Sequence, residues 1–71
     1  MIGDRLRAAR EAADMSQREL EDACGDLPSR IHQVAICQYE TGGRVPRLET
    51  IQRLCRALGV DLTTIIGDDH A

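Results

Sequence analysis

Two helix ends meet within residues 31–46, and this segment constrains the fold more than any other. A helical pattern ends at Gly42 and Gly43, which can take the left-handed backbone conformation that closes a helix. Pro46 follows and marks the start of another helix, with Arg44 at the junction. A small helical domain with such a basic junction can present one helix end to a nucleic acid.

Two short helices are predicted before this segment. Apolar residues at helical spacing predict an amphipathic helix over about residues 2–13. Ser16 and Glu19 have the spacing of a capping box, in which each side chain bonds an amide left unpaired at a helix start. They predict a second helix over about residues 16–24, which ends at Gly25.

Two more helices are predicted after it. Residues of about 47–58 have one apolar face, which consists of Leu48, Ile51, Leu54, Cys55 and Leu58. Gly59 ends this helix, and Asp61 can cap a last one from Leu62 to Ile66. A polar tail, residues 67–71, completes the chain. We therefore predict a single all-α domain over residues 1–71, with a five-helix core at about 2–66.

Composition excludes several classes of protein. The chain includes no Phe or Trp and one Tyr, so the core must be aliphatic. A domain of 71 residues buries a modest fraction of its surface, and we expect it to be marginally stable without a partner or ligand. Cys24, Cys37 and Cys55 match neither a disulfide framework nor a metal site, and we expect reduced thiols, with Cys24 and Cys55 in the core. No apolar run is long enough for a membrane span, and the N-terminus lacks the apolar segment of a signal peptide, which favours a cytoplasmic protein. Since the cysteine spacing does not fit a metal site, we expect no metal and no cofactor.

Charge is unevenly distributed along the chain. The net charge is -3, which by itself does not favour a nucleic-acid partner. Residues 30–56, however, hold five Arg against Glu40 and Glu49, a local charge of +3. Positive charge is thus concentrated in the segment that would meet phosphates.

The third helix has two distinct faces. Ile31, Ala35, Ile36 and Tyr39 can point to the core. The opposite stripe is Arg30, Gln33, Val34 and Cys37. Gln33 can pair with adenine, Val34 can touch a thymine methyl group, and Arg30 can reach a guanine or a phosphate. The stripe is therefore a candidate for reading bases in the DNA major groove, although a merely solvated face has the same pattern.

The sequence resembles the Cro/phage-repressor, or lambda-repressor-like, XRE-type helix-turn-helix family. The resemblance rests on Ser16-Gln17-Arg18-Glu19-Leu20 and on Glu40-Thr41-Gly42-Gly43-Arg44-Val45-Pro46, and it covers about residues 2–66. It implies backbone contacts to double-stranded DNA from Gln17, His32, Gln38, Gly43, Arg44 and Arg47. It also implies a partly buried ion pair of structural role between Arg10 and Glu40.

One departure from the family pattern lies between the second and third helices. Glu40 lies fifteen positions after Gly25, more than the family usually has, so the turn is enlarged. Either the third helix still begins near His32 after a longer loop, or Ser29 caps a longer helix with Arg30 at its end. We prefer the second alternative, because Ile31 then continues the apolar stripe. Glu21 also replaces the small residue that the family uses there.

These observations favour a sequence-specific transcriptional regulator, a repressor above all, and not an enzyme. The alternative is a helix-turn-helix module that binds a protein such as a toxin or a polymerase. Leu62, Ile65 and Ile66 form an apolar patch that can pack on the domain or on a second copy. The family often dimerises there, which implies a homodimer on an inverted repeat.

Overall fold

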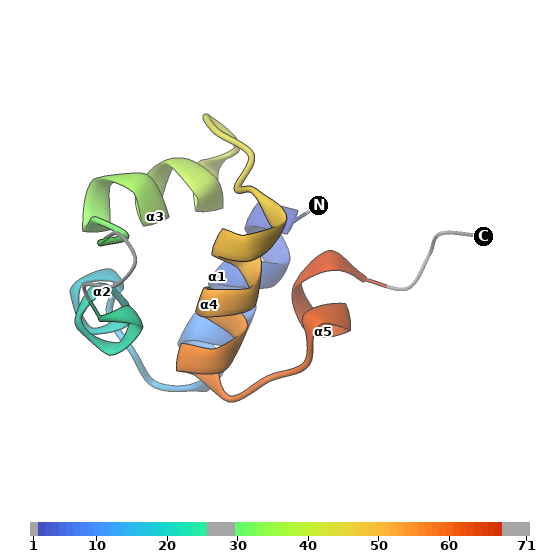
Figure 1. Ribbon diagram of the computed structural model, residues 1–71, viewed down its shortest axis with the longest axis horizontal. Coiled ribbons are helices and arrows are strands. Elements are labelled where there is room, and N and C mark those ends of the chain that lie inside the picture. The colour runs from blue at the N-terminus through green and yellow to red at the C-terminus, as the bar shows by residue number, and fades with distance from the viewer. Residues whose placement is uncertain (1, 26–29, 68–71) are drawn as a thin grey trace.

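The computed structural model describes residues 2–25 and 30–67, and this part of the chain folds into five helices without a strand (Figure 1). The helices are α1 (Ile2–Ala12), α2 (Gln17–Cys24), α3 (Gln33–Thr41), α4 (Leu48–Leu58) and α5 (Leu62–Ile66). The prediction of an all-α fold is confirmed. No helix among the described residues is long and apolar enough to cross a membrane.

Local signals set most of the helix ends. The predicted capping box is present, since the Glu19 amide donates to Ser16 Oγ at 3.0 Å and the Ser16 amide donates to Glu19 Oε1 at 2.8 Å. Gly42 and Gly59 take the left-handed conformation, with φ of 86° and 71°, and end α3 and α4. Asp61 occupies the N-cap position of α5, but its side chain makes no capping hydrogen bond.

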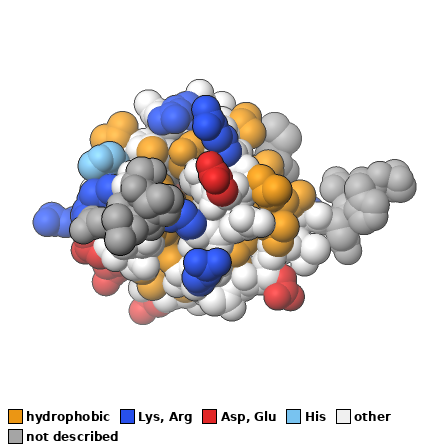
Figure 2. Space-filling view, viewed as in Figure 1, with side chains coloured by type: hydrophobic (Ala, Val, Ile, Leu, Met, Phe, Trp, Pro, Cys, Tyr) orange, Lys and Arg blue, Asp and Glu red, His pale blue; other side chains and the backbone are white. Residues whose placement is uncertain are grey.

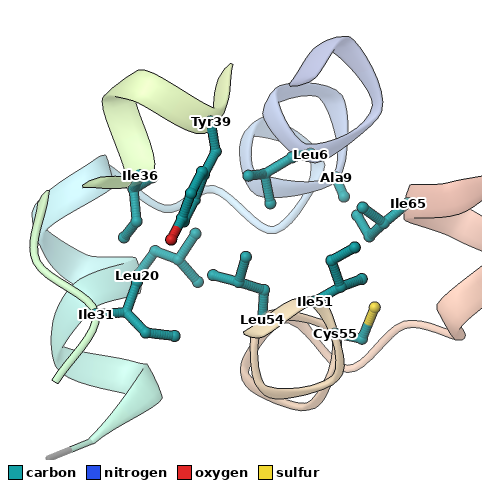
Figure 3. Close-up of a cluster of buried hydrophobic side chains, with 10 residues drawn as sticks. All are labelled: Leu6, Ala9, Leu20, Ile31, Ile36, Tyr39, Ile51, Leu54, Cys55 and Ile65. Atoms are coloured by element: carbon teal, nitrogen blue, oxygen red, sulfur yellow. The ribbon is translucent and has the colours of Figure 1, made fainter. Parts of the chain in front are cut away.

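The core lies where the five helices converge (Figure 3). α1 packs against α3 and α5, and α4 packs against α2 and α5. The buried apolar side chains are Leu6, Ala9, Leu20, Ile31, Ile36, Tyr39, Ile51, Leu54, Cys55 and Ile65. Tyr39 extends from α3 into this otherwise aliphatic cluster, as Figure 3 shows. Cys55 is a core residue as predicted, whereas Cys24 is half-buried and packs against the rim of the cluster.

A glycine brings the first turn of α1 against the last turn of α3. A Cβ atom on Gly3 would lie 2.5 Å from the carbonyl oxygen of Tyr39 and 2.7 Å from that of Glu40. Real side chains do not approach backbone oxygens so closely, so only glycine fits here. This contact fixes the C-terminal end of α3 on α1.

The preferred interpretation of the enlarged turn is wrong. α3 begins at Gln33, and residues 30–32 are not helical, with His32 in an extended conformation at the N-cap. Ile31 is buried all the same, so its apolar character reflects a loop side chain anchored in the core. The other alternative placed the start of this helix near His32, and that start is confirmed. Ser29 lies outside the described residues.

Two predicted apolar positions also differ from expectation. Leu48 was placed on the apolar face of its helix, but it is exposed because it occupies the first position of α4, beyond the core. Ile65 was placed in a possible dimer contact, but its exposed fraction is 0%. Its side chain is part of the core, because α5 packs against α1 and α4. It cannot also meet a second copy.

Candidate nucleic-acid interface

One face of α3 is open to solvent. Gln33, Val34 and Cys37 are exposed, and Val34 has an exposed fraction of 68%. Ile36 and Tyr39, on the other side of the helix, are buried as predicted. The structure therefore brings three of the four predicted groove-facing residues onto one accessible face, which begins at the first residue of the helix.

Arg30, the fourth predicted groove-facing residue, does not belong to this face. It precedes α3, and its side chain turns toward two acidic residues of α2. Arg30 Nε donates to Glu21 Oε2 at 2.7 Å, and Arg30 Nη2 donates to Asp22 Oδ1 at 3.3 Å. The prediction failed because it assumed a helix at residue 30, whereas the extended segment sends the side chain back to α2.

Glu21 also contacts the start of α3 itself. Its Oε1 atom accepts a hydrogen bond from the backbone amide of Gln33 at 2.8 Å. The His32 side chain occupies the N-cap position but makes no capping hydrogen bond. The hydrogen bond from Arg30 and then that from the Gln33 amide hold the pKa of Glu21 below its ordinary value. The sequence shows Glu21 in place of a small residue of the family pattern, but it does not predict the hydrogen bond from the Gln33 amide.

A buried polar network joins α1, α2 and α3 at the opposite end of α3. The predicted Arg10–Glu40 ion pair is present, with Arg10 Nε donating to Glu40 Oε2 at 2.7 Å and Nη2 to Oε1 at 3.1 Å. Arg10 Nη1 also donates to the carbonyl oxygen of Met15 at 2.7 Å. Hydrogen bonding to Glu40 raises the pKa of Arg10, so the pairing favours the charged form that arginine already has.

Gln17 is tied to the same network. Its Nε2 donates to Glu40 Oε1 at 3.1 Å, which orients the amide at the first position of α2. Gln17 is only partly exposed, so any contact with a phosphate would share the side chain with Glu40. The fold thus places the predicted phosphate ligand beside a structural ion pair.

The junction between α3 and α4 presents arginines on a rigid turn. The amides of Gly43 and Arg44 both donate to the carbonyl oxygen of Gln38, at 2.8 Å and 3.2 Å. The Gly43 amide is therefore already paired inside the molecule, contrary to its expected role at a phosphate. The guanidinium of Arg44 lies over the Tyr39 ring, 5.5 Å from its centroid. Arg47 is exposed at the N-cap position of α4.

A basic groove of about 380 Å³ separates the starts of α3 and α4. Its lining includes the charged residues Arg30, Arg44, Arg47, Glu49 and Arg53, together with His32. Arg53 was not predicted as part of the site, and its Nη2 also lies 3.4 Å from the Cys24 carbonyl oxygen at the end of α2. Figure 2 shows basic side chains over the α3–α4 segment, while most acidic side chains in that view lie along the lower edge.

Comparison with known proteins places these features in context. A family model described as "Helix-turn-helix" matches residues 6–65. The "Cryptic phage CTXphi transcriptional repressor RstR" of Vibrio cholerae is 26% identical over 70 residues, which are 99% of this chain and 59% of the relative. The chain therefore spans less than two thirds of the length of that protein. No solved structure gives a significant match.

Proposed function

The chain belongs to the helix-turn-helix family, and from this premise we propose that it is a sequence-specific, double-stranded DNA-binding transcriptional regulator that acts as a repressor. α3 enters the major groove with its N-terminal end first. The observation that carries this proposal is the exposure of Gln33 and Val34 in the first turn of a helix whose other face is buried. Packing in the core does not account for an exposed apolar side chain, Val34, at this position.

The exposed residues of α3 have the chemistry for base contacts. The amide of Gln33 can donate and accept at once to the N6 and N7 edge of adenine, and Val34 can pack on the methyl group of thymine. Cys37 lies farther along the same face and would meet the groove edge. Arg30 has no place among the base contacts in this proposal, because it holds the turn against Glu21 and Asp22.

The positive side chains on either side of α3 would hold the DNA backbone. Arg44 and Arg47 come from the turn that follows α3, and Gln17 comes from the first turn of α2. Phosphate contacts of this kind fix the position of the protein on the duplex without reading its sequence. His32, at the N-cap of α3, and Gln38, in its second half, can add weaker contacts. These contacts explain how a chain of net charge -3 can bind a polyanion.

We further propose a homodimer that binds an inverted repeat. Ile66 is exposed and Leu62 half-buried on α5, so they, without Ile65, form the apolar contact. Two copies related by a two-fold axis would place their α3 helices about 34 Å apart, one turn of the duplex. The spacing of half-sites in a bound sequence would report this distance.

Selection of bound fragments from a random duplex pool tests the proposal. We expect a selected sequence with two-fold symmetry and a dimer mass in solution. Binding to the selected duplex should weaken steeply with salt, because each neutralised phosphate releases counterions. A scrambled duplex should bind less tightly and with similar salt dependence. A folded protein that binds neither duplex at low salt would refute the proposal and favour a module that contacts protein.

A further inference from the structure

The first turn of α3 is capped from another helix. Helix starts leave backbone amides without partners, and a side chain at the N-cap position usually accepts from one of them. His32 holds that position but makes no such bond. The Gln33 amide donates instead to Glu21 Oε1, from the middle of α2, at 2.8 Å. The acceptor for the start of α3 is thus supplied by a residue twelve positions earlier in the chain.

The Glu21 carboxylate is itself held on both oxygens. Oε1 accepts from the Gln33 amide, and Oε2 accepts from Arg30 Nε at 2.7 Å. The exposed fraction of the Glu21 side chain is 14%, against 37% for Arg30, so the carboxylate is the more enclosed partner of this surface pair. Asp22 lies 3.3 Å from Arg30 Nη2 and His32 Nδ1 lies 4.0 Å from Glu21 Oε2. Both oxygens of the carboxylate are thus engaged, and the amide that Oε1 binds belongs to Gln33, the first residue of the exposed face of α3.

We propose that Glu21 is a positioning residue that sets the orientation of the reading end of α3 and thereby the base preference at the position read by Gln33. Glu21 does not touch DNA in this role; it acts through the backbone of Gln33. The inference rests on the proposed function. A negative charge also interacts favourably with the N-terminus of a helix, which strengthens the bond. Arg30 neutralises that charge where a phosphate would otherwise be repelled.

The test compares the affinities of Glu21 variants for the selected and the scrambled duplex. Glu21→Ala should reduce the ratio of the two affinities by about fivefold, the effect of losing a helix cap of ordinary strength. Glu21→Gln keeps an oxygen acceptor and should reduce the ratio less. An unchanged ratio in Glu21→Ala would overturn the inference.

Asp22→Asn is the matched control for charge. It removes the same charge at the neighbouring position, where Asp22 also pairs with Arg30, but it leaves the Gln33 amide bonded. We expect it to strengthen binding to both duplexes alike and to leave their ratio unchanged. If Asp22→Asn lowers the ratio as much as Glu21→Ala does, charge and not capping is responsible, and the inference fails.

A measurement without DNA keeps the inference testable if Glu21→Ala unfolds. In the ¹⁵N-labelled native protein, the amide proton resonance of Gln33 should move as acid protonates Glu21, and it should move likewise in Asp22→Asn. A Gln33 resonance that does not follow Glu21 would contradict the contact. Failure of the proposed function is seen separately, since the native protein would then bind no duplex.

Discussion

Two arginine–glutamate pairs hold the two ends of α3, and they differ in burial. Arg10 and Glu40 meet at the C-terminal end, with 11% and 4% of their side chains exposed. Arg30 and Glu21 meet at the N-terminal end, with 37% and 14% exposed. The shortest nitrogen–oxygen distance is 2.7 Å in both pairs. Distance alone therefore does not distinguish them, whereas access to water does.

The difference in burial assigns each pair a different role. A buried charge that loses its partner remains in a medium that does not solvate it, so removing either Arg10 or Glu40 alone should destabilise the fold strongly. A pair at the surface is screened by water and salt and contributes little to stability. The Arg30–Glu21 pair can therefore orient the N-terminal end of α3 without controlling whether the domain folds. One end of α3 is fixed by the core, and the other is set by a surface contact.

The largest expected effect comes from breaking the buried pair. Glu40→Ala strands the Arg10 guanidinium and also removes the acceptor of Gln17, so it should lower the free energy of unfolding by about 3–5 kcal/mol. Urea unfolding followed by circular dichroism measures the change. Replacing both partners by apolar residues, as in Arg10→Met with Glu40→Leu, should recover much of the loss. A surface pair contributes below about 1 kcal/mol. A loss that small in Glu40→Ala would contradict the difference drawn between the Arg10–Glu40 and Arg30–Glu21 pairs.

A smaller loss is expected from the glycine contact at the same end. Gly3→Ala places a methyl group 2.5 Å from the Tyr39 carbonyl oxygen, so α1 and α3 must separate. We expect a destabilisation of about 1–3 kcal/mol, typical of overpacking. Gly43→Ala is the control, since its nearest contact would be 3.7 Å, and it should leave stability nearly unchanged. Equal melting temperatures for the two variants would show that α1 and α3 are not tightly joined.

Breaking the Arg30–Glu21 pair should reduce stability less than Glu40→Ala or Gly3→Ala does. Arg30→Ala removes an arginine whose side chain is 37% exposed, and water screens its attraction to Glu21. We expect a loss of about 0–1 kcal/mol in urea unfolding, which falls further as salt rises. A loss as large as that of Glu40→Ala would place both ends of α3 in the fold's core and contradict the comparison.

The smallest expected effect on stability comes from acid, through Glu21 at the N-terminal end of α3. The folded protein holds the pKa of Glu21 below the ordinary value of 4.5, so the stability from its ionised form is fully present above that value. It is lost as the pH falls through the lowered pKa. The stability difference between native protein and Glu21→Gln should therefore shrink over this acidic range. A difference that stays constant there would show that the ionised carboxylate does not stabilise the turn.

Local chemistry made most of the fold predictable. The capping box at Ser16 and the glycines that end α3 and α4 act through neighbouring residues, so the sequence displays them directly. The start of α3 was not predictable in this way, because its cap comes from Glu21 on another helix. Ile31 misled the prediction, since burial of a loop side chain gives the same apolar signal as a helix.

The candidate site was predictable to the extent that helix periodicity controls it. Gln33, Val34 and Cys37 lie on one open face because they share a helix. Arg30 and the Gly43 amide were misplaced, since their partners, Glu21 and the Gln38 carbonyl, follow from tertiary contacts and turn geometry. Ile65 was likewise wrongly predicted in the dimer contact, because its side chain is buried in the core. Spacing in the sequence cannot tell which of two apolar neighbours the core will take.

If α3 reads bases through Gln33, the DNA affinities of Gln33→Ala must depend on the sequence of the duplex. They should be measured on the selected duplex, on its single-base variants and on a scrambled duplex. We predict a loss of about 1–3 kcal/mol on the selected duplex, relaxed preference at one base pair, and little change on the scrambled one. Arg44→Ala, the control, should weaken all duplexes alike. An equal loss on selected and scrambled duplexes in Gln33→Ala would contradict the account.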